Sequence, residues 1–260
     1  MNSRIFHIAT NTFREAVRDR VLYNLIAFAL LISAAAVLVG QISIEIERLV
    51  VINLGLTAVS LFGIVIAIFI GIGLVSKEID KRTLYTVLSR PVRRWEFIAG
   101  KFFGLSGTLV VNTFFMAIGV FAALAYVSHP QHFVSSDAGV LVALYFIVLQ
   151  FVIITALALF FSSFSTPIFS AIFAFWLFVI GSFAQDLRNF AAMAHGFTRW
   201  LATGAAYLVP NFSALNVITQ VAHGEPVSSQ LILLNTGYAL VYSIAVLSAA
   251  VLIFERRNLK

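Results

Sequence analysis

Residues 77–101 read KEIDKRTLYTVLSRPVRRWEFIAGK and hold seven of the 17 Lys and Arg residues of the chain. No charged residue occurs in the 27 positions before this segment or in the 26 positions after it. Each flank is long enough to cross a hydrocarbon core of ~30 Å, which takes about 20 apolar residues in a helix. The segment is therefore predicted to be a cationic connection between two membrane spans, and its polarity suits docking of a partner better than catalysis.

The composition excludes a soluble globular protein. Hydrophobic residues make up 61% of the 260 positions, charged residues only 11%, and Phe occurs 26 times, whereas charged residues are about a quarter of a typical soluble domain. We therefore expect an all-α integral membrane protein in which residues 1–260 form a single transmembrane domain. Its six transmembrane helices are predicted at about 21–40, 49–75, 102–127, 138–161, 167–185 and 230–254.

The distribution of basic residues predicts the orientation. With six spans, the N-terminus, the 77–101 loop, the 162–166 loop and the C-terminus share one side, which holds 14 of the 17 Lys and Arg residues. Because cytoplasmic loops carry the excess of basic residues, both termini are predicted to be cytoplasmic, in the plasma (cell inner) membrane. This asymmetry also accounts for the net charge of +6, so a nucleic-acid partner is not expected.

Residues 3–20 are predicted to form an amphipathic helix on the cytoplasmic membrane surface. Arg4, Arg14 and Arg18 fall on one stripe at helical spacing, and the opposite stripe is apolar, with Phe6, Ala9, Phe13, Ala16 and Val17. Such a helix directs arginines toward lipid phosphates and aromatic rings toward acyl chains. The alternative is an ordinary cytoplasmic start with a favourable charge.

The second span carries two patterns of interest. Gly63, Ala67 and Gly71 recur at steps of four, a spacing that lets a neighbouring backbone approach closely, either within the chain or across a dimer. Asn53, Thr57 and Ser60 form a polar side near the outer half of the same helix. They either face a polar cavity or satisfy local carbonyl groups.

Two further segments have distinct compositions. The fourth and fifth spans are joined only by 162–166, with Pro167 at the first helical position, and are rich in aromatic residues that either line a route for an amphiphile or face lipid.

The outer segment 186–229 is predicted to form short, half-immersed helices broken at Pro210-Asn211. His195 and His223 have no carboxylate at a ligand-like spacing, so no metal site is expected.

Motifs for independent chemistry are missing from the sequence. Gly100-Lys101 lacks the glycine and the hydroxyl residue of a phosphate-binding loop, and no HExxH motif is present. No titratable side chain lies in the middle of a predicted span, which disfavours a proton-coupled transporter. The chain is accordingly not expected to be an enzyme or to bind a cofactor directly.

The chain resembles a permease subunit of the type-2 ABC exporter class over essentially its whole length. The likeness rests on the layout and on a local pattern, which stands here as Lys77-Glu78, Arg82-Thr83-Leu84, Val87-Leu88, Pro91, Arg94 and Gly100-Lys101. The family usually has Gly-Thr where this chain has Arg82-Thr83. Within the class the chain is most similar to permeases of nitrous-oxide reductase maturation systems.

The resemblance implies a dimer of permeases, each docked through the 77–101 loop on a separate ATP-binding subunit, which holds the ATP and Mg²⁺. A helix of about 78–89, ending before Pro91, presents charged and apolar groups together. The residues expected to couple to the ATPase are Glu78, Asp80, Lys81, Arg82, Thr83, Leu84, Leu88, Pro91 and Arg94. The simpler interpretation of the loop is a solvated basic segment that only fixes topology.

Three functions are consistent with these observations to different degrees. The leading hypothesis is the membrane subunit of an ATP-driven exporter, whose aromatic spans hint at an amphiphilic substrate. The second is a membrane scaffold or assembly factor without a transport path. The third, an integral membrane enzyme that acts on lipid, is disfavoured by the missing catalytic residues.

Overall fold

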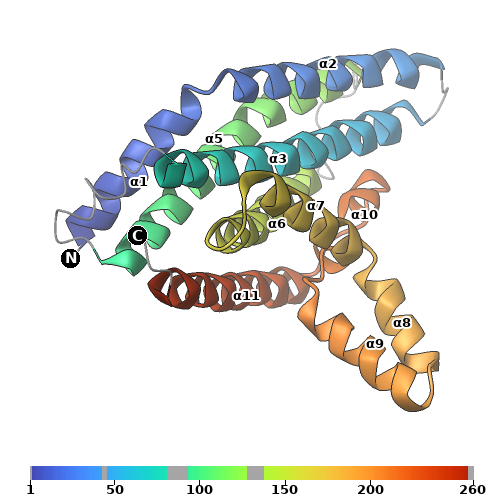
Figure 1. Ribbon diagram of the computed structural model, residues 1–260. Coiled ribbons are helices and arrows are strands. Elements are labelled where there is room, and N and C mark those ends of the chain that lie inside the picture. The colour runs from blue at the N-terminus through green and yellow to red at the C-terminus, as the bar shows by residue number, and fades with distance from the viewer. Residues whose placement is uncertain (1, 43–45, 81–92, 128–137, 257–260) are drawn as a thin grey trace.

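Helices form nearly all of the chain that the computed structural model describes, namely residues 2–42, 46–80, 93–127 and 138–256 (Figure 1). No strand occurs in these four ranges, so the expected all-α class is confirmed. The long helices are α1 (Asn2–Val17), α2 (Arg20–Ile42), α3 (Glu47–Asp80), α5 (Arg94–Val127), α6 (Ala138–Ser162), α7 (Pro167–Ser182), α8 (Ala184–Met193), α9 (Gly196–Leu208) and α11 (Ser229–Arg256). The short elements are the 3₁₀ turn η2 (Ser213–Leu215) and α10 (Ile218–Ala222).

Four to six segments of the described chain are long and apolar enough to span a membrane. Glu47–Gly73, Arg94–Val127, Ala138–Ser162 and Ser229–Phe254 qualify individually, and they agree with four of the six predicted spans. Two bent helix pairs bring the number to six if each pair is one span: α7 with α8, at 60°, and α9 with Ser213–Ala222, at 43°. The first predicted span corresponds to a shorter apolar stretch, Leu25–Gln41.

The fifth predicted span ends earlier than expected. Helix α7 stops at Ser182 rather than at residue 185, and the chain bends at Phe183 before α8 begins. A Cβ on Gly181 would lie 2.6 Å from the Phe212 ring, so α7 packs at this point directly against the segment that follows α9. At 1.5 Å per residue its 16 residues measure about 24 Å, short of a full bilayer core.

The helices alternate in direction, so that the two termini lie at the same end of the bundle (Figure 1). The hairpin of α8 and α9 projects from the opposite end. A hydrogen bond from Arg94 Nη1 to the Phe254 carbonyl, 2.6 Å long, ties the start of α5 to the end of α11 near the C-terminus. Assignment of this end to the cytoplasm rests on charge and stays a prediction.

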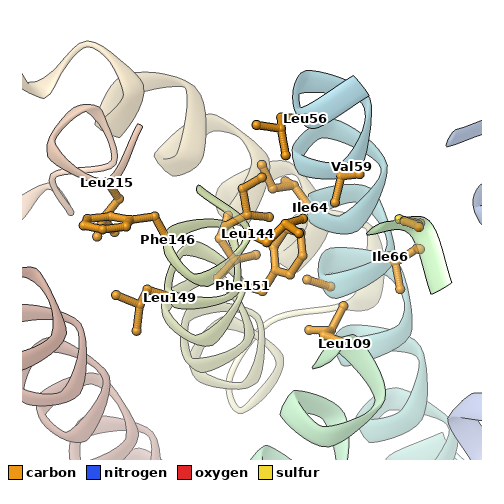
Figure 2. Packing of buried hydrophobic residues seen from close by; sticks show 14 of the residues in the cluster. Leu56, Val59, Ile64, Ile66, Leu109, Leu144, Phe146, Leu149, Phe151 and Leu215 are labelled. Carbon is orange, nitrogen blue, oxygen red and sulfur yellow. The ribbon is translucent and has the colours of Figure 1, made fainter. Parts of the chain in front are cut away.

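The core lies where α3, α5 and α6 meet, and Figure 2 shows Leu56, Ile64 and Phe151 within it. The small stripe of α3 is covered from within the chain. A Cβ on Gly63 would lie within 2.7 Å of three atoms of the Phe151 ring, and one on Gly71 would lie 3.2 Å from Ala158 Cβ, both on α6. Of the two possibilities for this stripe, packing within the chain is the one observed.

Helix α1 packs on a second set of glycines, on α5. A Cβ on Gly100 would lie 2.6 Å from Ile8 Cβ, and one on Gly104 would lie 2.6 Å from the Ala9 carbonyl oxygen. Ala16 is fully buried, but the Phe6 ring is 69% exposed. The predicted amphipathic helix is therefore confirmed. The expectation that its apolar face contacts lipid is only partly correct, because much of that face packs against α5.

The end of α1 also differs from the prediction. The helix ends at Val17 and not at residue 20, because the Arg18 and Asp19 amides donate to the carbonyls of Glu15 and Ala16, three residues back. This turn separates α1 from α2.

The hairpin of α6 and α7 is tight, as expected. Pro167 stands at the start of α7 after Thr166, which confirms the predicted helix start. Its aromatic residues divide by helix: Phe146 and Phe151 of α6 are buried, while Phe169 and Trp176 of α7 are more than half exposed. The Phe169 and Trp176 side chains therefore belong to the outer surface of this chain.

Candidate functional sites

The 77–101 segment begins as a direct continuation of α3. That helix runs unbroken from Glu47 to Asp80, so Glu78 and Asp80 belong to its last turn and no separate helix starts at residue 78. The remaining predicted coupling residues before Arg94, which are Lys81, Arg82, Thr83, Leu84, Leu88 and Pro91, lie outside the described residues.

The segment ends in a capped helix start. The carboxylate of Glu96 accepts a hydrogen bond of 2.9 Å from the backbone N–H of Arg93. Arg93 immediately precedes α5, and Glu96 is its third residue, which is the position from which a Glu in a capping box reaches back to the N-cap amide. The Glu96 side chain is 2% exposed, so this buried cap fixes the position at which α5 begins.

Arg94 joins the start of α5 to the last turns of α11. Its guanidinium donates to the Phe254 carbonyl oxygen and stands 5.8 Å from the centroid of the Phe254 ring. A cation near a helix C-terminus is also favoured by the helix dipole. The Phe254 ring stacks on Phe97, one turn further along α5, with centroids 6.1 Å apart. Arg94 is thus the one predicted coupling residue whose side-chain contacts the structure describes.

Lys101 reinforces the same junction from the other side. Its side chain is 1% exposed, and its Nζ lies 5.8 Å from the centroid of the Phe97 ring. The stacked pair Phe97–Phe254 therefore lies between two cations, Arg94 and Lys101. A small apolar cluster with Ile98 and Ala250 surrounds it. We refer to Arg94, Phe97, Lys101 and Phe254 as the α5–α11 junction.

Helix α1 packs on α5 at Gly100 and Gly104, close to this junction. Arg4, Arg14 and Arg18 are all exposed, as the prediction of a polar stripe requires. Contact of these arginines with lipid phosphates stays a prediction.

A second candidate site lies on α3, further from the termini. Asn53, Thr57 and Ser60 line a cavity of about 210 Å³, together with Asn216 and Thr219 from the segment around α10. Ser60 Oγ donates to Gln150 Oε1 at 3.2 Å, and Gln150 Nε2 donates to the Leu215 carbonyl at 3.1 Å. The predicted polar side of α3 therefore faces a cavity whose lining carries no formal charge and also includes apolar residues such as Leu61, Ile64 and Phe178.

Sequence reasoning missed the residues that organise this cavity. Gln150, 4% exposed, is the one residue of α6 with a side-chain amide, and its position in an uninterrupted apolar helix was the available signal. Asn216 comes from a segment that reads as a loop. Its Oδ1 accepts from the Ile218 amide at 3.3 Å and so starts α10.

The outer segment 186–229 forms short helices, and α9 ends at Leu208, which confirms the predicted break at Pro210-Asn211. The Asn211 amide donates to the Tyr238 hydroxyl of α11 at 2.8 Å, and Asn211 Oδ1 accepts from Ser213 Oγ at 2.7 Å. The chain after α9 is thereby attached to the bundle, whereas the α8–α9 hairpin extends beyond it (Figure 1). Half-immersion of the hairpin in a membrane stays a prediction.

A family model described as "ABC-2 family transporter protein" matches residues 6–259. The match covers nearly the whole chain, and the protein therefore belongs to this family of membrane-embedded transporter proteins. No curated protein sequence matches the chain.

Proposed function

We propose that this ABC-2 family member is the membrane-spanning permease subunit of an ATP-driven exporter. A separate ATP-binding subunit, docked on the 77–101 segment, hydrolyses ATP with Mg²⁺, while the present chain supplies the path and no catalytic group. The transported substrate is unidentified, and the aromatic surface of α7 favours an amphiphile. Residues 1–260 act as one transmembrane domain.

The observation that carries this proposal is the continuity of α3. One unbroken helix holds both the cavity residues Asn53, Thr57 and Ser60 and the predicted coupling residues Glu78 and Asp80. Ser60 and Glu78 are 18 residues apart, which at 1.5 Å per residue is ~27 Å. A displacement of the docked end therefore reaches the cavity without crossing a loop.

The α5–α11 junction supports the same interpretation. The 77–101 segment enters α5 at the Glu96 cap, and Arg94 links the start of α5 to Phe254 near the end of α11. A force applied to the segment by a partner thus acts on α3 at one side and on α5 and α11 at the other. A loop that only fixed topology would not need either attachment.

A second permease subunit would complete the cavity on α3. Thr57, Asn216 and Thr219 line the cavity and are exposed in this single chain. Polar groups at membrane depth are costly against lipid and normally face protein or a water-filled path. We therefore assign this face to a dimer in which two such cavities contribute to one path.

The cell inner membrane and a cytoplasmic position of both termini complete the proposal. They follow from the excess of basic residues at the termini and in the 77–101 segment. This orientation places the docking segment in the compartment where ATP is available.

Purification from membranes of the native host tests the coupling. The tagged chain is expected to bring down an ATP-binding subunit and ATPase activity, and Glu78→Ala/Arg82→Ala should lower that activity while the amount of inserted chain is unchanged. The matched control is Glu225→Ala/Arg48→Ala, which removes the same charges away from the segment. A wild-type eluate without an ATPase would favour the scaffold hypothesis, and equal activity in both double variants would refute docking at Glu78 and Arg82.

Disulfide crosslinking tests the dimer separately, because the chain has no cysteine. Thr57→Cys should form a disulfide-linked dimer in native membranes, and Phe103→Cys, which is also exposed but lies on α5, is the matched control. Equal yields from both positions would refute a specific interface. The closer similarity to permeases of nitrous-oxide reductase maturation remains a hypothesis, for which the coding neighbourhood of the gene is the test.

A further inference from the structure

The α8–α9 hairpin encloses a cavity that the proposed transport function does not use. Its volume is about 350 Å³, within the range of ~300–1,000 Å³ typical of small-molecule sites. Arg188 and Ala191 contribute from α8, and Arg199, Thr203, Ala206 and Tyr207 contribute from α9. Ala191 and Ala206 are 6% and 3% exposed, so small buried side chains leave the space open between the helices.

The polar lining of this cavity favours an anion. The polar residues that line it are Arg188, Arg199, Thr203 and Tyr207, and no acidic residue lines it. Among the residues that the structure describes, neither Arg188 nor Arg199 donates a hydrogen bond from its side chain or forms an ion pair. Two arginines on one cavity without an acidic partner suit a phosphate, which arginine binds in a bidentate manner.

The exposed surface of the α8–α9 hairpin is strongly apolar. Phe197, Trp200 and Tyr207 are 76%, 79% and 80% exposed, and Met193 and Leu208 are exposed to a similar degree. Such a surface beside a cationic cavity fits a molecule with a phosphate at one end and hydrocarbon at the other. Trp and Tyr are also the residues that favour the level of lipid headgroups.

We propose that the cavity between α8 and α9 binds the phosphate of a phospholipid headgroup. Arg188 and Arg199 hold the phosphate from the two helices, Thr203 and Tyr207 add hydroxyl donors, and the acyl chains lie along the exposed aromatic residues of the hairpin. Because two cations line the site, an anionic phospholipid binds more tightly than a zwitterionic one. The bound lipid fixes the hairpin at the membrane surface.

The purified full-length chain in detergent tests the proposal. Binding of phosphatidylglycerol and of phosphatidylcholine is counted by native mass spectrometry, with inorganic phosphate as a separate competitor. R188Q and R199Q should each weaken phosphatidylglycerol binding about tenfold, since one charge-assisted hydrogen bond is lost. R48Q, which removes an arginine of α3 that does not line the cavity, is the matched control and should bind as the wild type does.

A second measurement locates the lipid. In a W95F/W176F background, Trp200 is the remaining tryptophan, and brominated phosphatidylglycerol should quench its fluorescence at lower concentration than brominated phosphatidylcholine. R199Q should abolish this difference, and R199K, which keeps the charge but not the planar fork, should retain part of it. Size-exclusion profiles identify any variant that fails to fold, and R199Q, at an exposed position, decides the result if R188Q fails.

Three outcomes would overturn the proposal. Unchanged phosphatidylglycerol binding in both R188Q and R199Q would remove the arginines from the site. An equal loss in R48Q would show a general charge effect, and complete displacement of the lipid by millimolar inorganic phosphate would identify a site for the free anion. Each outcome leaves coupling to an ATPase intact, so this inference and the proposed function fail independently.

Discussion

Replacement of Gly63 by alanine should destabilise the protein through a single contact. Gly63 lies in α3 under the Phe151 ring of α6, and a Cβ there would fall within 2.7 Å of three ring atoms. Carbon atoms pack favourably at ~3.5–4.0 Å, so the nearest ring atom would have to withdraw by about 1.5–2 Å. Phe151 is 1% exposed and belongs to the main core cluster, which leaves it no empty space to enter.

The magnitude follows from two opposing effects. Overpacking of a core typically costs about 1–3 kcal/mol, and the full burial of Phe151 favours the upper end. The change from Gly to Ala in a helix interior returns ~1 kcal/mol through backbone propensity. We therefore expect Gly63→Ala to lower the free energy of unfolding by about 2 kcal/mol.

The same helix offers a matched control. A Cβ on Gly73 would meet nothing within 4 Å, so Gly73→Ala should be neutral or should raise the free energy of unfolding by up to ~1 kcal/mol. Denaturation in mixed detergent micelles, followed by tryptophan fluorescence, measures both variants. Phe151→Leu should cost less in the Gly63→Ala background than in the wild type, because the shorter side chain relieves the clash.

Equal unfolding free energies for the two alanine variants would refute the reasoning. So would an additive double variant of Gly63→Ala and Phe151→Leu, since additivity would mean that the two positions do not share the contact.

Three other predictions concern the remaining contacts. Gly104→Val should displace α1 from α5, because a Cβ there already meets the Ala9 carbonyl oxygen at 2.6 Å; limited proteolysis should then cut at Arg14, whereas Gly107→Ala, with its nearest neighbour at 3.8 Å, should be protected as in the wild type. Arg94→Met should lower the free energy of unfolding, measured by thermal denaturation, by about 1–2 kcal/mol. This is the lower end for a charge-assisted hydrogen bond, because Arg94 is partly exposed. Unfolding as in the wild type would show that the α5–α11 junction does not stabilise the fold. Single cysteines at Ser89 and Lys260 should be shielded from an impermeant reagent added outside intact cells, and one at Ser228 should react; labelling at Ser89 would reverse the orientation.

Hydropathy predicted the four longest spans because a long uncharged run has few alternatives to a membrane helix. The limits of α3 and α5 were less accurate. Both helices extend into charged sequence, to Asp80 and from Arg94, since a helix needs apolar side chains only where it contacts lipid. The end of α7 at Ser182 was not predictable, because it accompanies the packing of Gly181 against Phe212, a contact between residues 31 positions apart.

The environments of the polar residues were likewise predictable only in part. The positions of Asn53, Thr57 and Ser60 on one side of a helix follow from its period, so the cavity on α3 was foreseeable. Burial of Glu96 and Lys101 was not, because charged residues in a basic segment are usually solvated. Their neighbours Phe97 and Ile98 pack against the end of α11, which lies more than 150 residues further along the chain.

The close contact at Gly63 would act as the pivot if α3 tilted as a rigid body. The helix is unbroken on both sides of the pivot, with Glu78 about 22 Å away on one arm and Asn53 about 15 Å away on the other, at 1.5 Å per residue. A tilt of about 10° would move Glu78 by ~4 Å and Asn53 by ~3 Å in the opposite direction. In such a tilt the displacement at the cavity would be set by the position of one glycine, and moving that glycine along the helix would change the ratio of the two arms without altering either end.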